Sequence, residues 1–174
     1  MEYTFTLKYQ LTDDDCGRDT LIECLGEAGC DDALVGAGQP GRLALEFTRE
    51  AADADEAVRS ALANVRCAVP SARLIEVAPD LVGLTAVAEI VGVSRQNMRK
   101  LMLAHPGSFP APVHEGSASI WHLADVLAWL QVKGSYSLTK DVLDVARVAL
   151  QVNVAKEGRR LPRSEFNELE ALIG

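Results

Sequence analysis

The sequence predicts an α+β protein built in three parts, and three observations lead to this fold class. Apolar residues alternate with polar ones in short runs within residues 1–80. Residues 84–101 have the pattern of two short helices joined at a glycine, and apolar residues recur at steps of 4 and 3 over 138–152. With 174 residues, 48% of them hydrophobic, the chain can form one large or two small cores, which excludes a disordered polar chain.

Charge is unevenly distributed along the chain. The 17 basic and 25 acidic residues give a net charge of −8, which as a whole disfavours binding to nucleic acid. However, residues 1–80 contain 7 basic and 16 acidic residues, a net charge of −9, whereas residues 81–135 contain 4 and 3 and residues 136–174 contain 6 and 6. The acidity therefore predicts a separate N-terminal unit, and the remainder of the chain is close to neutral.

The acidic unit has the pattern of four strands and two helices. Alternation predicts a strand over 3–9, and the acidic run Asp13–Asp15 precedes a helix that Gly26 and Gly29 can end. A short strand over 33–36, a turn at 39–41 and a strand over 42–47 form a hairpin. Asp53 or Asp55 begins a helix that stops at Pro70, and a last strand covers 72–77.

This order, β-α-β-β-α-β, predicts a ferredoxin-like domain over residues 1–79, with both helices on one face of a four-stranded sheet. Residues 78–80 form a short linker to the next part. The four cysteines are expected to be reduced thiols in a cytoplasmic protein, with Cys24 and Cys67 buried. No secretory signal or membrane-spanning run is visible.

The second part, residues 80–135, contains the pattern of a helix-turn-helix. Thr85 is expected to cap the first helix, Gly92 to end it with a positive φ, and Ser94 to cap the second. A buried cluster then consists of Val87, Ile90, Val91, Val93, Met98 and Leu101. The second helix exposes Arg95, Gln96, Asn97, Arg99 and Lys100, the residue types that contact bases and phosphates.

A hairpin and a third helix follow. Residues 109–113 and 116–121 predict the hairpin, with Glu115–Gly116 near its tip, and residues 122–130 predict an amphipathic helix. With Phe109-Pro110-Ala111-Pro112, Trp121 and Trp129-Leu130 in place, residues 82–134 resemble the winged helix-turn-helix of the AlpA/excisionase family, related to MerR-type DNA-binding domains. The resemblance implies a DNA-binding wing, which here carries histidine and serine where such proteins usually carry Arg or Lys.

The candidate DNA-contacting residues are Thr85, Ser94, Arg95, Gln96, Asn97, Arg99, Lys100, His114, Ser117, Ser119 and His122. Arg99 and Lys100 have the alternative interpretation of a solvated helix face, whereas Trp121 and Trp129 are expected in the core. No catalytic, metal or cofactor site is predicted, because no phosphate loop or metal-ligand spacing occurs. For Asp13–Asp15 a solvated helix-capping turn is the preferred interpretation over a metal-binding cluster.

The third part, residues 136–174, is predicted to be helical. Leu138, Val142, Val145, Ala149 and Val152 form one apolar stripe of a helix over 138–156, and Leu143, Ala146 and Leu150 form a second beside it. Such a face must be buried against this chain or against a second copy. We interpret it as a dimerisation segment, followed by an Arg-rich break at 158–163 and a short helix capped by Ser164.

These features predict a sequence-specific, double-stranded-DNA-binding protein that acts as a dimeric transcriptional regulator and is not an enzyme. One alternative is a protein–protein adaptor or an antitoxin-like autoregulator, whose acidic domain binds a partner protein. Another is an excisionase-like factor that bends DNA during recombination. The partner of the acidic domain, a protein or a small molecule, is not specified by the sequence.

Overall fold

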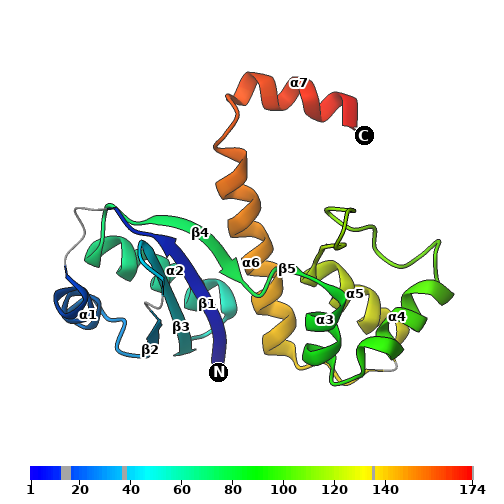
Figure 1. The fold of residues 1–174 in the computed structure, drawn as a ribbon, viewed down its shortest axis with the longest axis horizontal. Helices are drawn as coiled ribbons and strands as arrows, with labels where there is room; N and C mark the ends of the chain where they lie inside the picture. The colour runs from blue at the N-terminus through cyan, green and yellow to red at the C-terminus, as the bar shows by residue number, and fades with distance from the viewer. Residues whose placement is uncertain (13–16, 37–38, 135, 174) are drawn as a thin grey trace.

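The computed structural model describes residues 1–12, 17–36, 39–134 and 136–173, which form a mixed α+β fold with an antiparallel sheet and seven helices (Figure 1). The acidic run Asp13–Asp15, together with Cys16, lies outside the described residues. The described residues form two hydrophobic cores, one on the four-stranded sheet and one among the central helices.

The sheet consists of β1 (Glu2–Gln10), β2 (Ala33–Gly36), β3 (Arg42–Glu50) and β4 (Arg73–Ala78), in the order β2-β3-β1-β4 with every neighbouring pair antiparallel. Phe5 pairs with Phe47 in the register of β1 and β3, and their rings stack at 5.3 Å. Alternate residues of these long strands are buried and their neighbours are mostly exposed. The alternation predicted from sequence is thus confirmed, and one face of the sheet is left to solvent.

Two helices, α1 (Arg18–Glu27) and α2 (Ala54–Ala68), contribute to the core on the covered face. Asp53 begins α2 by accepting a hydrogen bond from the Glu56 amide at 2.8 Å, and the Glu56 carboxylate accepts one from the Ala52 amide at 2.9 Å. This reciprocal cap explains why α2 starts at Ala54. Cys30 is buried in this core, but Cys24 is half-buried and Cys67 exposed, so the expectation that these two are buried is wrong. Cys67 lies near the end of α2, outside its buried stripe.

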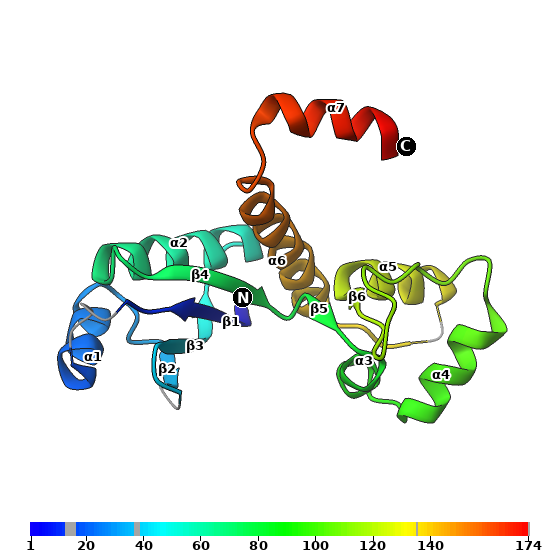
Figure 2. The same ribbon diagram turned by 45° about the horizontal axis from the view of Figure 1, so that its top comes forward.

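The second core is formed by β5 (Leu81–Val82), α3 (Leu84–Val91), α4 (Arg95–Ala104), β6 (Trp121–His122) and α5 (Leu123–Lys133). The two short strands pair antiparallel, with Val82 opposite Trp121. We call residues 81–133 the central unit. In both views α4 lies at the opposite end of the molecule from α1 (Figures 1 and 2).

The long helix α6 (Lys140–Gly158) connects the two cores. Val145, Val148 and Ala149 are buried in the core on the sheet, whereas Leu143 and Ala146 are buried in the core of the central unit. The sequence left open whether this apolar face is buried against the same chain or against a second copy. In the structure the same chain buries it. The last helix, α7 (Arg163–Ile173), has no buried residue, and Ser164 lies inside it rather than at its cap.

The predicted linker at residues 78–80 is a buried junction. Asp80 is 1% exposed, and its carboxylate accepts hydrogen bonds from His122 Nδ1 at 2.7 Å and from Asn153 Nδ2 at 2.7 Å. Asn153 of α6 also pairs with both backbone groups of Val77 at 2.9 and 2.8 Å, in the way a neighbouring strand would. Asn153 of α6 therefore satisfies the free backbone hydrogen-bonding groups of Val77 on the edge strand β4. Through Asp80 it also holds the chain in place where the central unit begins.

Among the described residues, no helix is long and apolar enough to cross a membrane.

Candidate nucleic-acid interface

The turn between α3 and α4 is set by Gly92, which adopts a left-handed φ of 77°. The Gly92 amide donates to the Glu89 carbonyl at 3.2 Å, and the Val93 amide donates to the Ala88 carbonyl at 2.9 Å. These two bonds close the end of α3 in a Schellman arrangement, for which a residue without Cβ is favoured. Gly92 thus ends α3 as the sequence predicts.

Ser94 begins α4, since its hydroxyl accepts a hydrogen bond from the Asn97 amide at 3.1 Å. This confirms the predicted cap and leaves other amides of the first turn directed outward at the positive end of the helix dipole. The expected cap at Thr85 is wrong, because α3 already starts at Leu84, two residues earlier than a cap at Thr85 requires. Its N-cap is Gly83, and Thr85 lies exposed in the first turn.

Helix α4 is buried along one side only. Met98 is 1% exposed, and Leu101 and Met102 pack against the same core. Val87, Val91 and Val93 join this core as predicted, but Ile90 is 37% exposed and does not. The helix is therefore anchored by its apolar side, and its opposite side is free of contacts with the core.

The exposed side of α4 carries several polar side chains and the large apolar side chain of Leu103. Arg95, Gln96, Arg99, Lys100 and Leu103 recur at helical spacing and are all exposed. Asn97, at the edge of this face, is exposed as well. Leu103, 61% exposed, was not among the residues that the sequence singled out, although its position four residues after Arg99 places it on the same face. We call Arg95, Gln96, Asn97, Arg99, Lys100 and Leu103 the α4 face.

The cations of the α4 face form no ion pair with the residues that the structure describes. Among the described residues, no carboxylate lies within ion-pair distance of Arg95, Arg99 or Lys100. In an acidic protein this is a notable local excess of positive charge, and it lies far from the acidic α1 in both views of the ribbon (Figures 1 and 2). The arrangement leaves the guanidinium and ammonium groups available to an anionic partner.

The segment between α4 and β6 is held by aromatic rings. Trp121 Nε1 donates to the Pro110 carbonyl at 3.0 Å, and Phe109 meets both Trp121 and Trp129 edge-on at 6.1 and 5.1 Å. Trp121 is buried and Trp129 packs against the same core, as expected from the sequence. These contacts position the loop beside the C-terminal end of α4.

The predicted hairpin of this loop is much shorter than expected. Residues 109–113 form no strand, and the pairing is a single antiparallel bridge between His114 and Ile120 before β6 begins. Two prolines, Pro110 and Pro112, lack the amide needed for a longer ladder, which accounts for the difference. His114 and Ser117 are exposed at this tip, whereas Ser119 is half-buried.

His122 is not part of the exposed surface that the sequence suggested. Its side chain is 19% exposed, and its Nδ1 is engaged by the buried carboxylate of Asp80. No pattern in the sequence indicated this bond, because the two residues are 42 positions apart and Asp80 was expected in a linker. The structure therefore brings Ser94 and the α4 face together, places His114 and Ser117 on a separate exposed loop, and assigns His122 to the junction.

Within the described residues there is no group of three His, Cys, Asp or Glu side chains that could hold a metal ion. In comparisons with protein-family models, curated proteins and solved structures, nothing matches this chain.

Proposed function

We propose that this protein binds double-stranded DNA in a sequence-specific manner and acts as a transcriptional regulator, with α4 entering the major groove. The observation that carries the proposal is the α4 face, an exposed row of base- and phosphate-binding side chains without internal ion partners among the described residues. The glycine-ended turn before it and the Ser94 cap support a helix-turn-helix. The bridge at His114 supports a short wing.

Each side chain of the α4 face has a chemical counterpart on DNA. Arg95 and Arg99 suit the O6 and N7 acceptors of guanine, and Gln96 and Asn97 suit the N6 and N7 groups of adenine. Lys100 and the amides of the Ser94-capped turn suit phosphate oxygens. Leu103 adds an apolar contact of the kind made with the methyl group of thymine.

We further propose that residues 1–79 are a ferredoxin-like domain, which the strand order β2-β3-β1-β4 and the single covered face of the sheet support. The net charge of −9 over residues 1–80 opposes contact of this part with the duplex, so the affinity comes from the central unit. One helix-turn-helix contacts few base pairs, and pairing of two copies doubles these contacts. Because the apolar stripes of α6 are buried in the two cores, we assign pairing to α7, whose Phe166, Leu169, Leu172 and Ile173 are all exposed on one helix.

Selection of bound sequences from random duplex DNA tests the function directly. We expect a short sequence motif to be enriched, and a dimer to enrich a two-fold repeat of that motif. When the selection is repeated with the Arg99→Ala variant, some base positions of the motif should no longer be enriched. The Asp55→Ala variant, altered at an exposed pair with Arg59 on α2, serves as the control and should select the same motif. Absence of any enriched motif at low salt would rule out sequence-specific binding.

A further inference from the structure

A large cleft lies between the end of α2, the start of β4 and the end of α6. Its volume is about 950 Å³, within the range of small-molecule sites. It contains residues from three distant parts of the chain, and no candidate site proposed from the sequence included it. Its lining consists of Tyr9, Leu62, Arg66, Val69, Pro70, Ser71, Ala72, Arg73, Leu74, Lys156, Arg159 and Arg160.

Five of these residues are cationic and none of the described lining residues is acidic. Lys156 is engaged by the Ile75 carbonyl and by Glu157, and Arg160 also pairs with Glu157 at 2.6 Å. Arg66, Arg73 and Arg159 make no ion pair with any described residue. Three exposed guanidinium groups thus gather without an internal counter-ion among the described residues, and two of them belong to residues 1–80, whose net charge is −9.

The remaining lining is largely apolar. Tyr9 and Val69 belong to the buried core, and Leu62 and Leu74 are half-buried beside them. A ligand in the cleft would therefore meet a hydrophobic wall as well as the arginines. An apolar surface with a few convergent charged groups is the usual make-up of a site for a small organic molecule.

We propose that this cleft binds a small organic anion that carries a phosphate group and a ring or other apolar part. Arg66, Arg73 and Arg159 hold the phosphate, because the planar guanidinium donates two parallel hydrogen bonds to phosphate oxygens. The apolar part packs on Leu62 and Leu74. A small anion fits these observations better than a DNA backbone, because a duplex would bring many further phosphates towards residues 1–80, whose net charge is −9.

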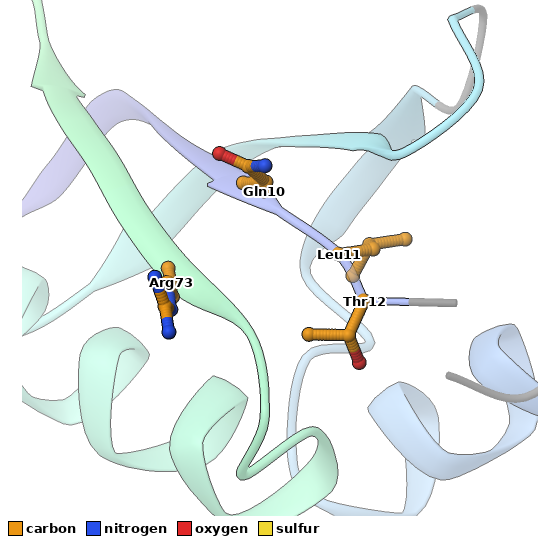
Figure 3. Close-up of a pocket in the computed structure, with 4 residues that line it drawn as sticks. All are labelled: Gln10, Leu11, Thr12 and Arg73. Atoms are coloured by element: carbon orange, nitrogen blue, oxygen red, sulfur yellow. The ribbon is translucent and has the colours of Figure 1, made fainter. Parts of the chain in front are cut away.

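Arg73 also lines a smaller pocket of about 330 Å³ with Gln10, Leu11 and Thr12, at the end of β1 (Figure 3). Arg66 and Arg159 line only the large cleft among the pockets described above, so they are the better positions for substitution.

Titration of the 174-residue chain with adenosine 5′-monophosphate at low ionic strength, followed by calorimetry, tests the proposal. Adenosine is the uncharged counterpart of this probe, and we expect it to bind at least about tenfold more weakly. The variant Arg66→Gln/Arg159→Gln should weaken binding of the monophosphate by about tenfold or more. Arg66 and Arg159 are both exposed, so the variant should retain its fold, and thermal unfolding monitored by circular dichroism checks this.

The control variant Lys140→Gln/Arg147→Gln removes two exposed positive charges from α6 outside the cleft and should leave the affinity within about twofold. Equal binding of adenosine and its monophosphate, equal loss in both double variants, or no binding of the monophosphate at millimolar concentration would each overturn the proposal. A duplex of random sequence provides a further arm. If only duplex binding depends on Arg66 and Arg159, the cleft is a DNA-backbone contact and the small-anion site is wrong.

Discussion

Asp80 is the residue on which the junction between the two cores depends. Its buried carboxylate accepts hydrogen bonds from His122 and Asn153, and its carbonyl accepts one from the Leu123 amide at 2.7 Å. In Asp80→Ala these side-chain donors lose their acceptor in a buried site. We expect the free energy of unfolding to fall by about 2–4 kcal/mol, measured by urea denaturation.

A matched substitution separates this effect from loss of a surface charge. Asp55 forms an exposed ion pair with Arg59 on α2, and Asp55→Ala is expected to cost less than about 1 kcal/mol. If Asp80→Ala were no more destabilising than Asp55→Ala, the junction would not be held by this carboxylate.

Asp32 makes stability dependent on pH. Arg49 Nε and Nη2 donate to its two carboxylate oxygens at 2.7 and 2.8 Å, and these bonds hold the pKa of Asp32 below its ordinary value of 3.8. The unfolded chain therefore takes up this proton at a higher pH than the native one, so the stabilisation is present above about pH 4 and is lost as pH falls through the folded pKa.

The variant Asp32→Asn tests this dependence. At pH 7 we expect it to be less stable than the parent by about 1–2 kcal/mol, with the difference constant down to about pH 5 and shrinking between about pH 5 and pH 3. Urea denaturation of both proteins across this range measures the difference. A gap that stays constant down to pH 3 would show that the carboxylate charge is not what Arg49 stabilises.

Two C-terminal helices differ in how much they contribute to the fold. Every described residue of α7 is exposed, whereas α6 buries side chains in both cores. An isolated helix of 11 residues is marginal in water, so little stability is expected from α7 in a single chain. In α6, by contrast, removing one buried side chain leaves a cavity.

Deleting residues 163–174 should therefore change the free energy of unfolding of the monomer by less than about 1 kcal/mol. Leu143→Ala on α6, where Leu143 is 4% exposed, should cost about 2–4 kcal/mol, and Leu169→Ala on the exposed α7 close to nothing. Chemical denaturation at low protein concentration measures all three. Sedimentation at high concentration shows in addition whether dimers are lost with α7, as expected if α7 pairs two copies.

Local patterns were sufficient to predict most elements. Alternation in residues 3–9, the Asp53 cap and Gly92 each act within a few neighbouring residues, and the strands, α2 and the α3–α4 turn follow from them. The predicted hairpin differed because two prolines removed ladder donors, and the cap at Thr85 differed because the N-cap of α3 is Gly83, two residues earlier. Boundaries of this kind depend on packing as well as on local sequence.

At the scale of the molecule, the features that the sequence could not predict depend on contacts between residues far apart in the chain. The same periodicity in α6 fits burial against a partner copy or against this chain, and only the placement of two cores on either side of the helix decides between them. Asp80 bonds with His122 and Asn153, which lie 42 and 73 positions further along the chain. The large cleft likewise brings together residues of α2, β4 and the end of α6. The α4 face, in contrast, lies within one helix and was largely predictable, apart from Leu103.

The charges of the whole molecule are separated along its length. Helix α4 lies at the opposite end of the molecule from α1 of the acidic unit (Figure 1), so a protein of net charge −8 still presents the cations of the α4 face, which pair with none of the described carboxylates. Under the proposed function, affinity for DNA is modest for each copy and depends on salt, because few phosphates are neutralised.

Recognition of DNA by α4 is tested by measuring how Arg95→Ala/Arg99→Ala binds a selected duplex, using fluorescence anisotropy over a range of salt concentrations. We predict that the affinity falls by about 100-fold or more at low salt and that the dependence of affinity on salt becomes shallower. The control Arg42→Ala/Arg59→Ala, which removes two exposed charges from the N-terminal unit, should bind as the parent does. Unchanged affinity of the α4 variant, or an equal loss in both variants, would contradict recognition of DNA by α4.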